Sequence, residues 1–338
     1  MDIRERKSIR KSRKRRCVQR EYIPTPEIKD LKSLIELAQT KIRYSNINVE
    51  VLWNVLPELQ KLDEMIGMEK LKESVFYQII YYLQNLNERS PNEYLHTVIL
   101  GPPGCGKTTI AQIIGEIYKK MKILSPNGTF KVAKREDLVG EYLGQTAVKT
   151  KKLLMSCLGG VLFIDEAYAL GPGQKDRDSY SKEAIDTMNA FLSDHKDKIC
   201  CIIAGYEEEI KKCLFSVNPG LERRFQWVHR IDTYTDNDLA RMCLKKIDEI
   251  KWETNVDINT FEKIIKDNKE LFKNYGGDIE NLVNKSKLCH AKRVFCLDEK
   301  FRFTLVNKDF DDAIEMMKKN KLVDNKEEED QPPPSLYM

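Results

Sequence analysis

A glycine-rich segment directly after an apolar run constrains this chain more than any other feature. Residues 95 to 100 read Leu-His-Thr-Val-Ile-Leu, and they are followed by Gly101, Pro102, Pro103, Gly104, Cys105, Gly106, Lys107, Thr108 and Thr109. This spacing of glycines between a strand and a helix predicts a loop whose backbone N–H groups surround phosphates. Lys107 adds a positive charge at the β- and γ-phosphates, and Thr108 offers a hydroxyl to Mg²⁺. We therefore expect these nine residues to bind a nucleotide.

The residues after the loop have helical periodicity. Isoleucines recur on one helical face, at Ile110, Ile113, Ile114 and Ile117. A helix that begins here directs the positive end of its dipole at the phosphates. The same dipole and Lys107 favour a thiolate at Cys105, so we expect this cysteine to be open to oxidation or alkylation.

An acidic pair follows a second apolar run. Residues 161 to 164 read Val-Leu-Phe-Ile, and Asp165 and Glu166 come next. Alone, such a pair is typical of an acidic turn after a core strand. Beside a phosphate loop, Asp165 is predicted to hold Mg²⁺ with Thr108, and Glu166 to orient and deprotonate the water that attacks the γ-phosphate. The two segments together predict hydrolysis of ATP with Mg²⁺.

Strands and helices alternate through the middle of the chain. Predicted strands cover residues 95–100, 129–133, 160–164, 199–204 and about 226–231. This alternation predicts an α/β fold with a parallel sheet. Two short helices are expected over 27–62 and a longer one over 68–86. After Thr233 the pattern becomes helical, with breaks near Asn255, Gly276, Gly277 and Asn307.

Composition and periodicity divide the chain into five parts. They are a basic disordered arm at 1–20, a helical extension at 21–62, an α/β nucleotide-binding domain at 63–232, a helical lid domain at 233–320 and an acidic, proline-rich tail at 321–338. The arm holds ten Lys and Arg against two acidic residues. It fits a nuclear address, a nucleic-acid contact, a contact for an acidic partner or a solvated segment without structure.

Two observations limit the classes of protein to which this chain can belong. No apolar run approaches the length of a membrane span, and the arginine-rich N-terminus lacks the apolar stretch of a secretion signal. The nine cysteines form no C-x-x-C pair, and no histidine lies at metal-ligand spacing from any of them. We therefore expect reduced thiols in an intracellular protein, cytoplasmic or nuclear, without a membrane partner.

The order of the motifs resembles the AAA+ ATPases, and within them the group that contains the red-type Rubisco activase CbbX and the sporulation protein SpoVK. Besides the two nucleotide motifs, the resemblance rests on Ile66-Gly67, residues 137–147, 179–185, 204–206 and 218–225, and it covers about residues 63 to 320. It implies an AAA+ P-loop fold with a five-stranded parallel sheet, flanking helices and a C-terminal helical lid. It also implies a homo-oligomeric ring, usually a hexamer, with ATP held between neighbours, and it assigns Ile66 and Gly67 to the nucleotide site.

The resemblance also assigns residues that act between subunits. Arg224 aligns with the arginine that reaches the γ-phosphate of the adjacent subunit, and Arg223 beside it is the substitute. Such a guanidinium neutralises charge in the transition state of phosphoryl transfer. The alternative is a pair of solvated surface charges.

A further segment resembles the family's pore loop. Tyr142, Leu143 and Gly144 occupy the positions at which the family grips extended polypeptide with an aromatic side chain on the ring axis. A flat ring contacts many side chains without demanding one sequence, and glycine gives the backbone freedom. The alternative is a tyrosine packed under a loop.

Two positions depart from the family pattern. Ile279 and Glu280 stand where CbbX-like proteins carry a lid arginine, so that sensor is expected to be absent. Gly205 and Tyr206 stand where many AAA+ proteins have a polar sensor, which leaves Tyr206 as the candidate. Residues 1–62 match nothing in the family, so the target of the ATPase does not transfer.

Three functions can be weighed against these sequence features. The first is a ring that remodels or disassembles a protein complex by pulling polypeptide past Tyr142. The second is a nucleic-acid motor or loader that uses the basic arm. The third, a nucleotide-gated scaffold without turnover, is disfavoured by intact Lys107, Asp165 and Glu166. An aromatic pore segment with no adjacent basic cluster favours an unknown protein substrate over nucleic acid.

Overall fold

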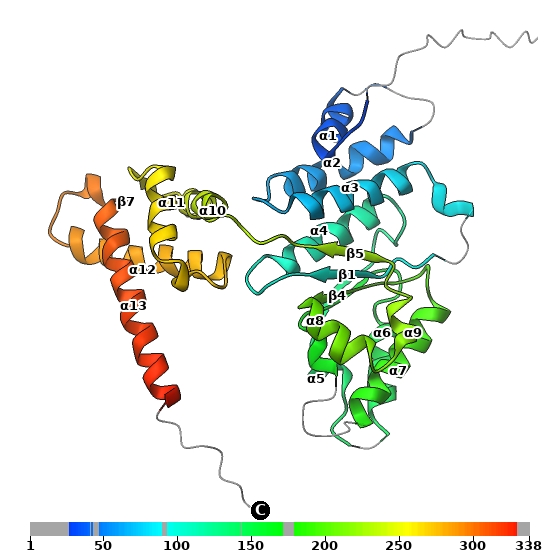
Figure 1. Cartoon of the computed structure of the whole chain (residues 1–338). Coiled ribbons are helices and arrows are strands. Elements are labelled where there is room, and N and C mark those ends of the chain that lie inside the picture. Colours follow the sequence, from blue (N-terminus) through cyan, green and yellow to red (C-terminus); the bar gives the residue numbers. More distant parts are fainter. Residues whose placement is uncertain are drawn as a thin grey trace, which may run out of the picture.

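The computed structural model describes residues 27–40, 42, 47–89, 93–142, 144–171 and 179–329, the last eight of these by their backbone alone. Figure 1 shows an α/β part and, beside it, a helical C-terminal part joined by the segment after strand β5. The predicted arm, Leu143 of the predicted pore segment and residues 330–338 lie outside the described residues.

Five parallel strands form the main sheet, in the order β2-β3-β4-β1-β5. They are β1 (Thr97–Leu100), β2 (Phe130–Ala133), β3 (Val161–Ile164), β4 (Cys200–Gly205) and β5 (Trp227–Arg230). The three inner strands are buried along their whole length, which is why their sequences are continuous apolar runs. The predicted five-stranded parallel sheet is confirmed, and each strand lies within two residues of its predicted range.

Alternate residues of the inner strands point into two separate hydrophobic cores. Along β3, Val161 and Phe163 belong to the first core, whereas Leu162 and Ile164 belong to the second. This is the two-residue period of a strand with both faces covered. Side chains of α3 (Glu69–Leu83) and α4 (Lys107–Lys120) complete the first core, and those of α6 (Thr146–Met155) and α7 (Ser179–Asp194) complete the second.

The N-terminal helices are built into the first core. α1 (Leu31–Gln39) and α2 (Val49–Asp63) contribute side chains to it, and α2 packs against α4. The buried carboxylate of Glu58 on α2 pairs with Lys120 on α4. The extension therefore covers one face of the α/β part and shares its core (Figure 1).

Short helices complete the α/β part. They are η2 (Leu86–Arg89), α5 (Arg135–Leu138), η3 (Ala167–Leu170), α8 (Glu207–Glu209), η4 (Ile210–Phe215) and α9 (Pro219–Glu222). Three of them are next to predicted site residues: η3 follows Asp165 and Glu166, α5 precedes the loop of Tyr142, and α9 precedes Arg223 and Arg224. Among all the helices of the described ranges, none combines the length and the apolar character that a bilayer span needs.

The C-terminal part is helical, as predicted. It contains α10 (Asp236–Glu249), α11 (Ile258–Asp267), η5 (Lys269–Leu271), α12 (Gly276–Val294), η6 (Glu299–Phe301) and α13 (Asn307–Glu329). A parallel pair, β6 (Glu253–Thr254) and β7 (Thr304–Leu305), was not predicted, because two-residue strands leave no periodic pattern. α13 continues past residue 320, where we predicted the lid to end.

Candidate active site

The phosphate loop connects the carboxyl end of β1 to the first turn of α4. Gly104 and Gly106 have φ values of 67° and 84°, a left-handed conformation in which a side chain would be strained. Gly106 is the N-cap of α4 and has no side chain to satisfy the first N–H groups of the helix. Those N–H groups remain as donors for an anion, and carboxyl ends of parallel strands are where such folds bind ligands.

Lys107 lies back over this loop. Its Nζ donates hydrogen bonds to the carbonyl oxygens of Gly101 at 3.1 Å and Pro102 at 2.7 Å. Phosphate oxygens can replace these acceptors without moving the helix, since only the flexible lysine stem has to turn. Thr109, the last residue of the motif, is exposed on the first turn of α4, and Pro103 is half-buried in the loop.

The acidic pair lies at the end of β3, with only β4 between β3 and β1. Thr108 Oγ1 is 3.4 Å from Asp165 Oδ2, so the hydroxyl and the carboxylate predicted to share Mg²⁺ are adjacent. Oxygen donors suit Mg²⁺, which takes its remaining ligands from phosphates and water. The described residues contain no cluster of three or more His, Cys, Asp or Glu that could hold a metal by themselves.

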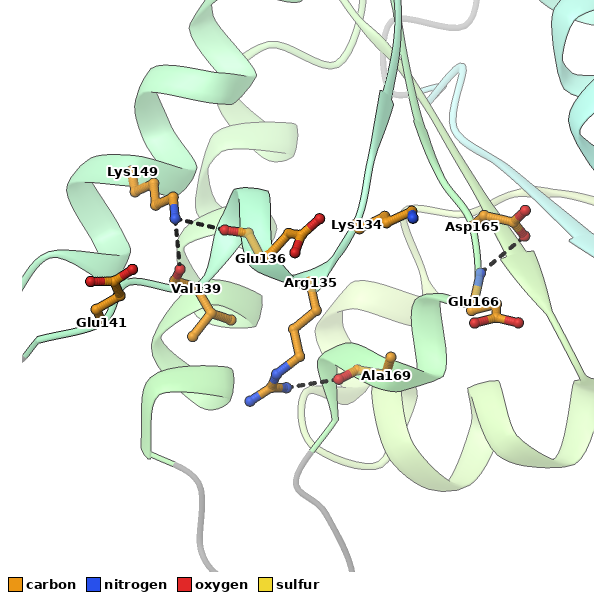
Figure 2. A pocket seen from close by; sticks show the side chains of 9 residues that line it. All are labelled: Lys134, Arg135, Glu136, Val139, Glu141, Lys149, Asp165, Glu166 and Ala169. Carbon is orange, nitrogen blue, oxygen red and sulfur yellow. Dashed lines mark hydrogen bonds between the residues drawn. The ribbon is translucent and has the colours of Figure 1, made fainter.

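Glu166 has an unusual backbone conformation. Its φ is 49°, a left-handed value that costs a residue with a side chain about 1–2 kcal/mol. Its N–H donates to Asp165 Oδ1 at 3.0 Å, and its carbonyl accepts from the N–H of Ala169 at 2.8 Å. Its exposed carboxylate borders a cavity of about 710 Å³ between the β3 turn and α5 (Figure 2).

Cys105 does not have the reactivity that we predicted. Its side chain is buried, and its Sγ lies 2.9 Å from the carbonyl oxygen of Pro102. Burial raises the pKa of the Cys105 thiol, and the opposing effect of the Lys107 ammonium is smaller. The prediction of an open thiolate is therefore wrong, because the loop folds this side chain inward.

The segment before α3 and the start of the C-terminal part meet at the same loop. Gly67 has a φ of 67°, and a Cβ at this position would lie 3.2 Å from the ring of Tyr234. The Tyr234 hydroxyl donates to the carbonyl of Cys105 at 3.1 Å, and its ring contacts that of Tyr275 at 5.4 Å. Ile66, half-buried, precedes Gly67 in this segment.

The two tyrosines were missed by the sequence analysis. Tyr234 and Tyr275 are far apart in the chain and belong to no local motif, so no sequence signal marked them. The turn before α12 also approaches the phosphate loop, because a Cβ on Gly104 would lie 2.1 Å from the carbonyl oxygen of Asn274. This part of the lid therefore borders the site, and Ile279 behind it is buried.

Tyr206, at the end of β4, lies between the two nucleotide motifs. The centre of its ring is 5.7 Å from Lys107 Nζ and 5.8 Å from the ring of Tyr168. Burial, together with the charges of Glu209 and Glu166, raises the pKa of the Tyr206 hydroxyl. The side chain is thus a neutral hydrogen-bond donor at neutral pH, close to where a γ-phosphate would lie.

The two arginines lie apart from this pocket, at the end of α9. Arg224 is half-buried, and its guanidinium donates to Ser193 Oγ at 2.5 Å and to the carbonyl of Gly220. Arg223 is exposed. Arg224 is thus held between α7 and α9, and these bonds do not involve the phosphate loop of its own chain.

Tyr142 also lies apart from the pocket, in the loop between α5 and α6. Its side chain is 67% exposed, which is contrary to a tyrosine packed under a loop. Gly144 has a φ of 81°, and a Cβ there would meet nothing within 4 Å. The loop therefore presents an aromatic ring to solvent.

Known proteins are similar to this chain in sequence and in fold. Residues 97–231 match the family described as "ATPase family associated with various cellular activities (AAA)". The chain is 34% identical over 269 residues to stage V sporulation protein K of Bacillus subtilis, which covers 76% of this chain and 82% of that protein. It is 34% identical over 250 residues to the chloroplastic Rubisco activase of Cyanidioschyzon merolae, covering 71% of this chain and 80% of the activase.

Another relative is longer. The chain is 41% identical over 271 residues to a cfxQ-like protein of Acanthamoeba polyphaga mimivirus, which is 78% of this chain but 66% of the viral protein. The chain thus spans just under two thirds of that relative.

Solved structures have the same fold. The Thermotoga maritima RuvB Holliday junction branch migration motor matches with a TM-score of 0.51 at 19% identity, covering 75% of this chain and 71% of RuvB. The FIGL-1 AAA domain in complex with ADP matches with a TM-score of 0.51 at 17% identity, covering 87% of this chain and 92% of that domain. At these identities the likeness concerns the fold alone.

Proposed function

Because this chain belongs to the AAA family of ATPases, we propose that it is a ring-forming Mg-ATP hydrolase that remodels or disassembles a protein complex by pulling polypeptide through a central pore. The observation that carries this proposal is the exposed ring of Tyr142 on a loop that lies two elements from the candidate hydrolytic carboxylate of Glu166. An ATPase that performs mechanical work on a polypeptide needs both features in one rigid part.

Each residue of the pocket has a distinct role in this proposal. The loop N–H groups and Lys107 bind the β- and γ-phosphates. Mg²⁺, held by Thr108 and Asp165, would neutralise charge on the phosphate oxygens. Glu166 orients the attacking water and accepts its proton. Tyr206 donates to the γ-phosphate oxygens or to that water, and Tyr234 closes the site beside the loop.

The two candidate finger residues, Arg223 and Arg224, lie at the end of α9. The guanidinium that borders the Glu166 cavity, that of Arg135, is bonded to Ala169 and Ser181. A neighbouring subunit in a ring, of six copies by analogy with the family, would supply a guanidinium to the γ-phosphate. We assign it to Arg224, with Arg223 as the substitute. An arginine supplied in this way contributes about 10³ to 10⁵ in rate.

The experiment that tests the proposed function begins with a trap. In the Glu166→Gln variant hydrolysis stops, so a ring should stay bound to whatever it was processing, and a pull-down identifies the target. Tyr142→Ala should then bind and hydrolyse ATP yet fail to remodel that target. Tyr77→Ala is a matched control, because Tyr77 is an equally accessible tyrosine, 59% exposed on α3. Normal remodelling by the Tyr142→Ala protein would exclude threading past this side chain.

The runner-up is a nucleic-acid-associated motor or loader. Ten Lys and Arg in residues 1–20 favour it, because such a segment would neutralise several phosphates and also suits a nuclear location. Deleting residues 1–20 should remove any salt-sensitive binding to a labelled oligonucleotide. Binding that survives the deletion would exclude the arm as the contact.

A further inference from the structure

Arg135 connects the candidate pore loop to the turn that carries Glu166. It is the first residue of α5, directly after β2, and its guanidinium donates to the carbonyl oxygen of Ala169 at 2.7 Å and to Ser181 Oγ at 2.6 Å. We infer that Arg135 is a positioning residue, which fixes the Glu166 turn and couples it to the loop of Tyr142. The coupling rests on the proposed function, whereas the positioning of Glu166 does not.

The Glu166 turn needs such a contact. Glu166 has a left-handed backbone, and the single-turn helix η3 begins at the next residue. A strained conformation persists only where surrounding contacts determine it. Arg135 donates to the carbonyl of Ala169 (Figure 2). The N–H of Ala169 in turn donates to the carbonyl of Glu166. Ala169 therefore connects the Arg135 guanidinium to the backbone of Glu166, the candidate hydrolytic residue.

At its other end, α5 and the start of the candidate pore loop are bonded to α6. Lys149 of α6 donates to the carbonyls of Glu136 and Val139 at 2.6 and 3.0 Å (Figure 2). The N–H of Gly140, two residues before Tyr142, donates to Thr146 Oγ1 at 3.0 Å. Because α5 is a single turn held at both ends, a displacement of the Tyr142 loop that shifts Val139 or Gly140 has to move Arg135 or break one of these bonds.

The second acceptor of Arg135 adds another connection. Ser181 is fully buried in the first turn of α7. Arg135 thus joins the starts of α5 and α7 to the Glu166 turn. Both bonds leave from the same nitrogen, Nη1, at the end of the long arginine side chain.

The test uses the full-length protein with ATP and with the non-hydrolysable analogue AMP-PNP. Arg135→Ala should lower kcat by about 10²-fold, the usual effect of displacing a catalytic group by about 1 Å, with the KM for ATP unchanged within about twofold. Arg135→Lys, which keeps a charged donor on a shorter side chain, should recover part of kcat. Lys152→Ala, which removes an exposed cation of α6, is the matched control and should change neither constant.

Hydrogen exchange measures the coupling itself. In the wild type, AMP-PNP should slow amide exchange both in residues 101–110 and in residues 139–147. In Arg135→Ala the first effect should remain, which shows that nucleotide is bound, and the second should disappear. A kcat equal to that of the wild type would overturn the positioning role. A response of residues 139–147 that survives in Arg135→Ala, or that is missing in the wild type, would overturn the coupling. The ATP hydrolysis of the wild type and the protection of residues 101–110 test the proposed function separately.

Discussion

Two buried histidines make the stability of this fold depend on pH in a way that can be calculated. His96 precedes β1 and accepts a hydrogen bond at Nδ1 from the N–H of Cys201 at 3.2 Å. His229, in β5, contacts Gln78 Oε1 through Nε2 at 3.2 Å and Ser74 Oγ through Nδ1 at 2.9 Å. Neither imidazole is exposed to solvent. Burial lowers the pKa of each from 6.5 to about 4.

The sign and size of the effect follow from these values. In the unfolded chain both histidines bind a proton below pH 6.5, whereas in the folded protein they remain neutral until about pH 4. The unfolded state therefore binds more protons in this window, and the free energy of unfolding falls as the pH decreases through it. At pH 5 each histidine should reduce that free energy by about 2 kcal/mol relative to pH 7.5, or about 4 kcal/mol for both.

Urea unfolding followed by circular dichroism, at pH 7.5 and at pH 5.0, measures this loss. The His229→Gln variant has no titrating group at that position, so its loss of stability between the two pH values should be smaller than the wild-type loss by about 2 kcal/mol. The comparison removes the contribution of the carboxylates, which is common to both proteins. Equal losses in the two proteins, or an NMR titration that gives His229 an ordinary pKa in the folded state, would refute the reasoning.

The remaining predictions concern the site. Lys107→Ala should abolish ATP binding in calorimetry, because Lys107 supplies the cation of the phosphate loop; affinity equal to that of the wild type would contradict this role. Glu166→Gln should keep ATP bound without hydrolysing it and should increase the assembled fraction in sedimentation experiments with ATP; rapid turnover would exclude Glu166 as the base. Arg224→Ala should lower the kcat of the assembled protein about 10³-fold or more while ATP still binds. If that arginine acts on the neighbouring subunit, mixing Arg224→Ala with inactive Lys107→Ala subunits should restore activity, and no recovery would argue for action within one chain. Gly104→Ala combines a left-handed φ with a Cβ 2.1 Å from the carbonyl oxygen of Asn274, so ATP should bind about tenfold more weakly or worse. Gly277→Ala, where a Cβ would meet nothing within 4 Å, is the control for that variant and should bind ATP normally.

Much of the fold could be predicted because its signals are local. The inner strands are short apolar runs, and the helices have one apolar face, so periodicity located all five strands to within two residues. The parallel direction followed from the alternation of strands and helices. The pair β6 and β7 was missed because two residues per strand carry no period, and its pairing depends on side chains that are distant in the chain.

In the candidate site too, local features could be predicted and contacts between distant segments could not. The phosphate loop and the acidic pair could be predicted because their chemistry lies in consecutive residues. The burial of Cys105 could not, because it depends on how the loop folds over its own carbonyl of Pro102. Tyr234 could not be predicted either, since its hydroxyl meets the loop from 129 positions away.

The sequence by itself determined the nucleotide motifs, the class of the sheet and the helical character of the C-terminal part. Each depends on interactions within a few residues, such as glycine conformation, strand alternation and helix periodicity. Only the tertiary structure decided that Glu166 has a left-handed backbone, that Tyr142 is exposed and that Arg135 contacts Ser181, 46 positions further along the chain. These features depend on which distant segments pack together, and the free energy of that packing has no local pattern in the sequence.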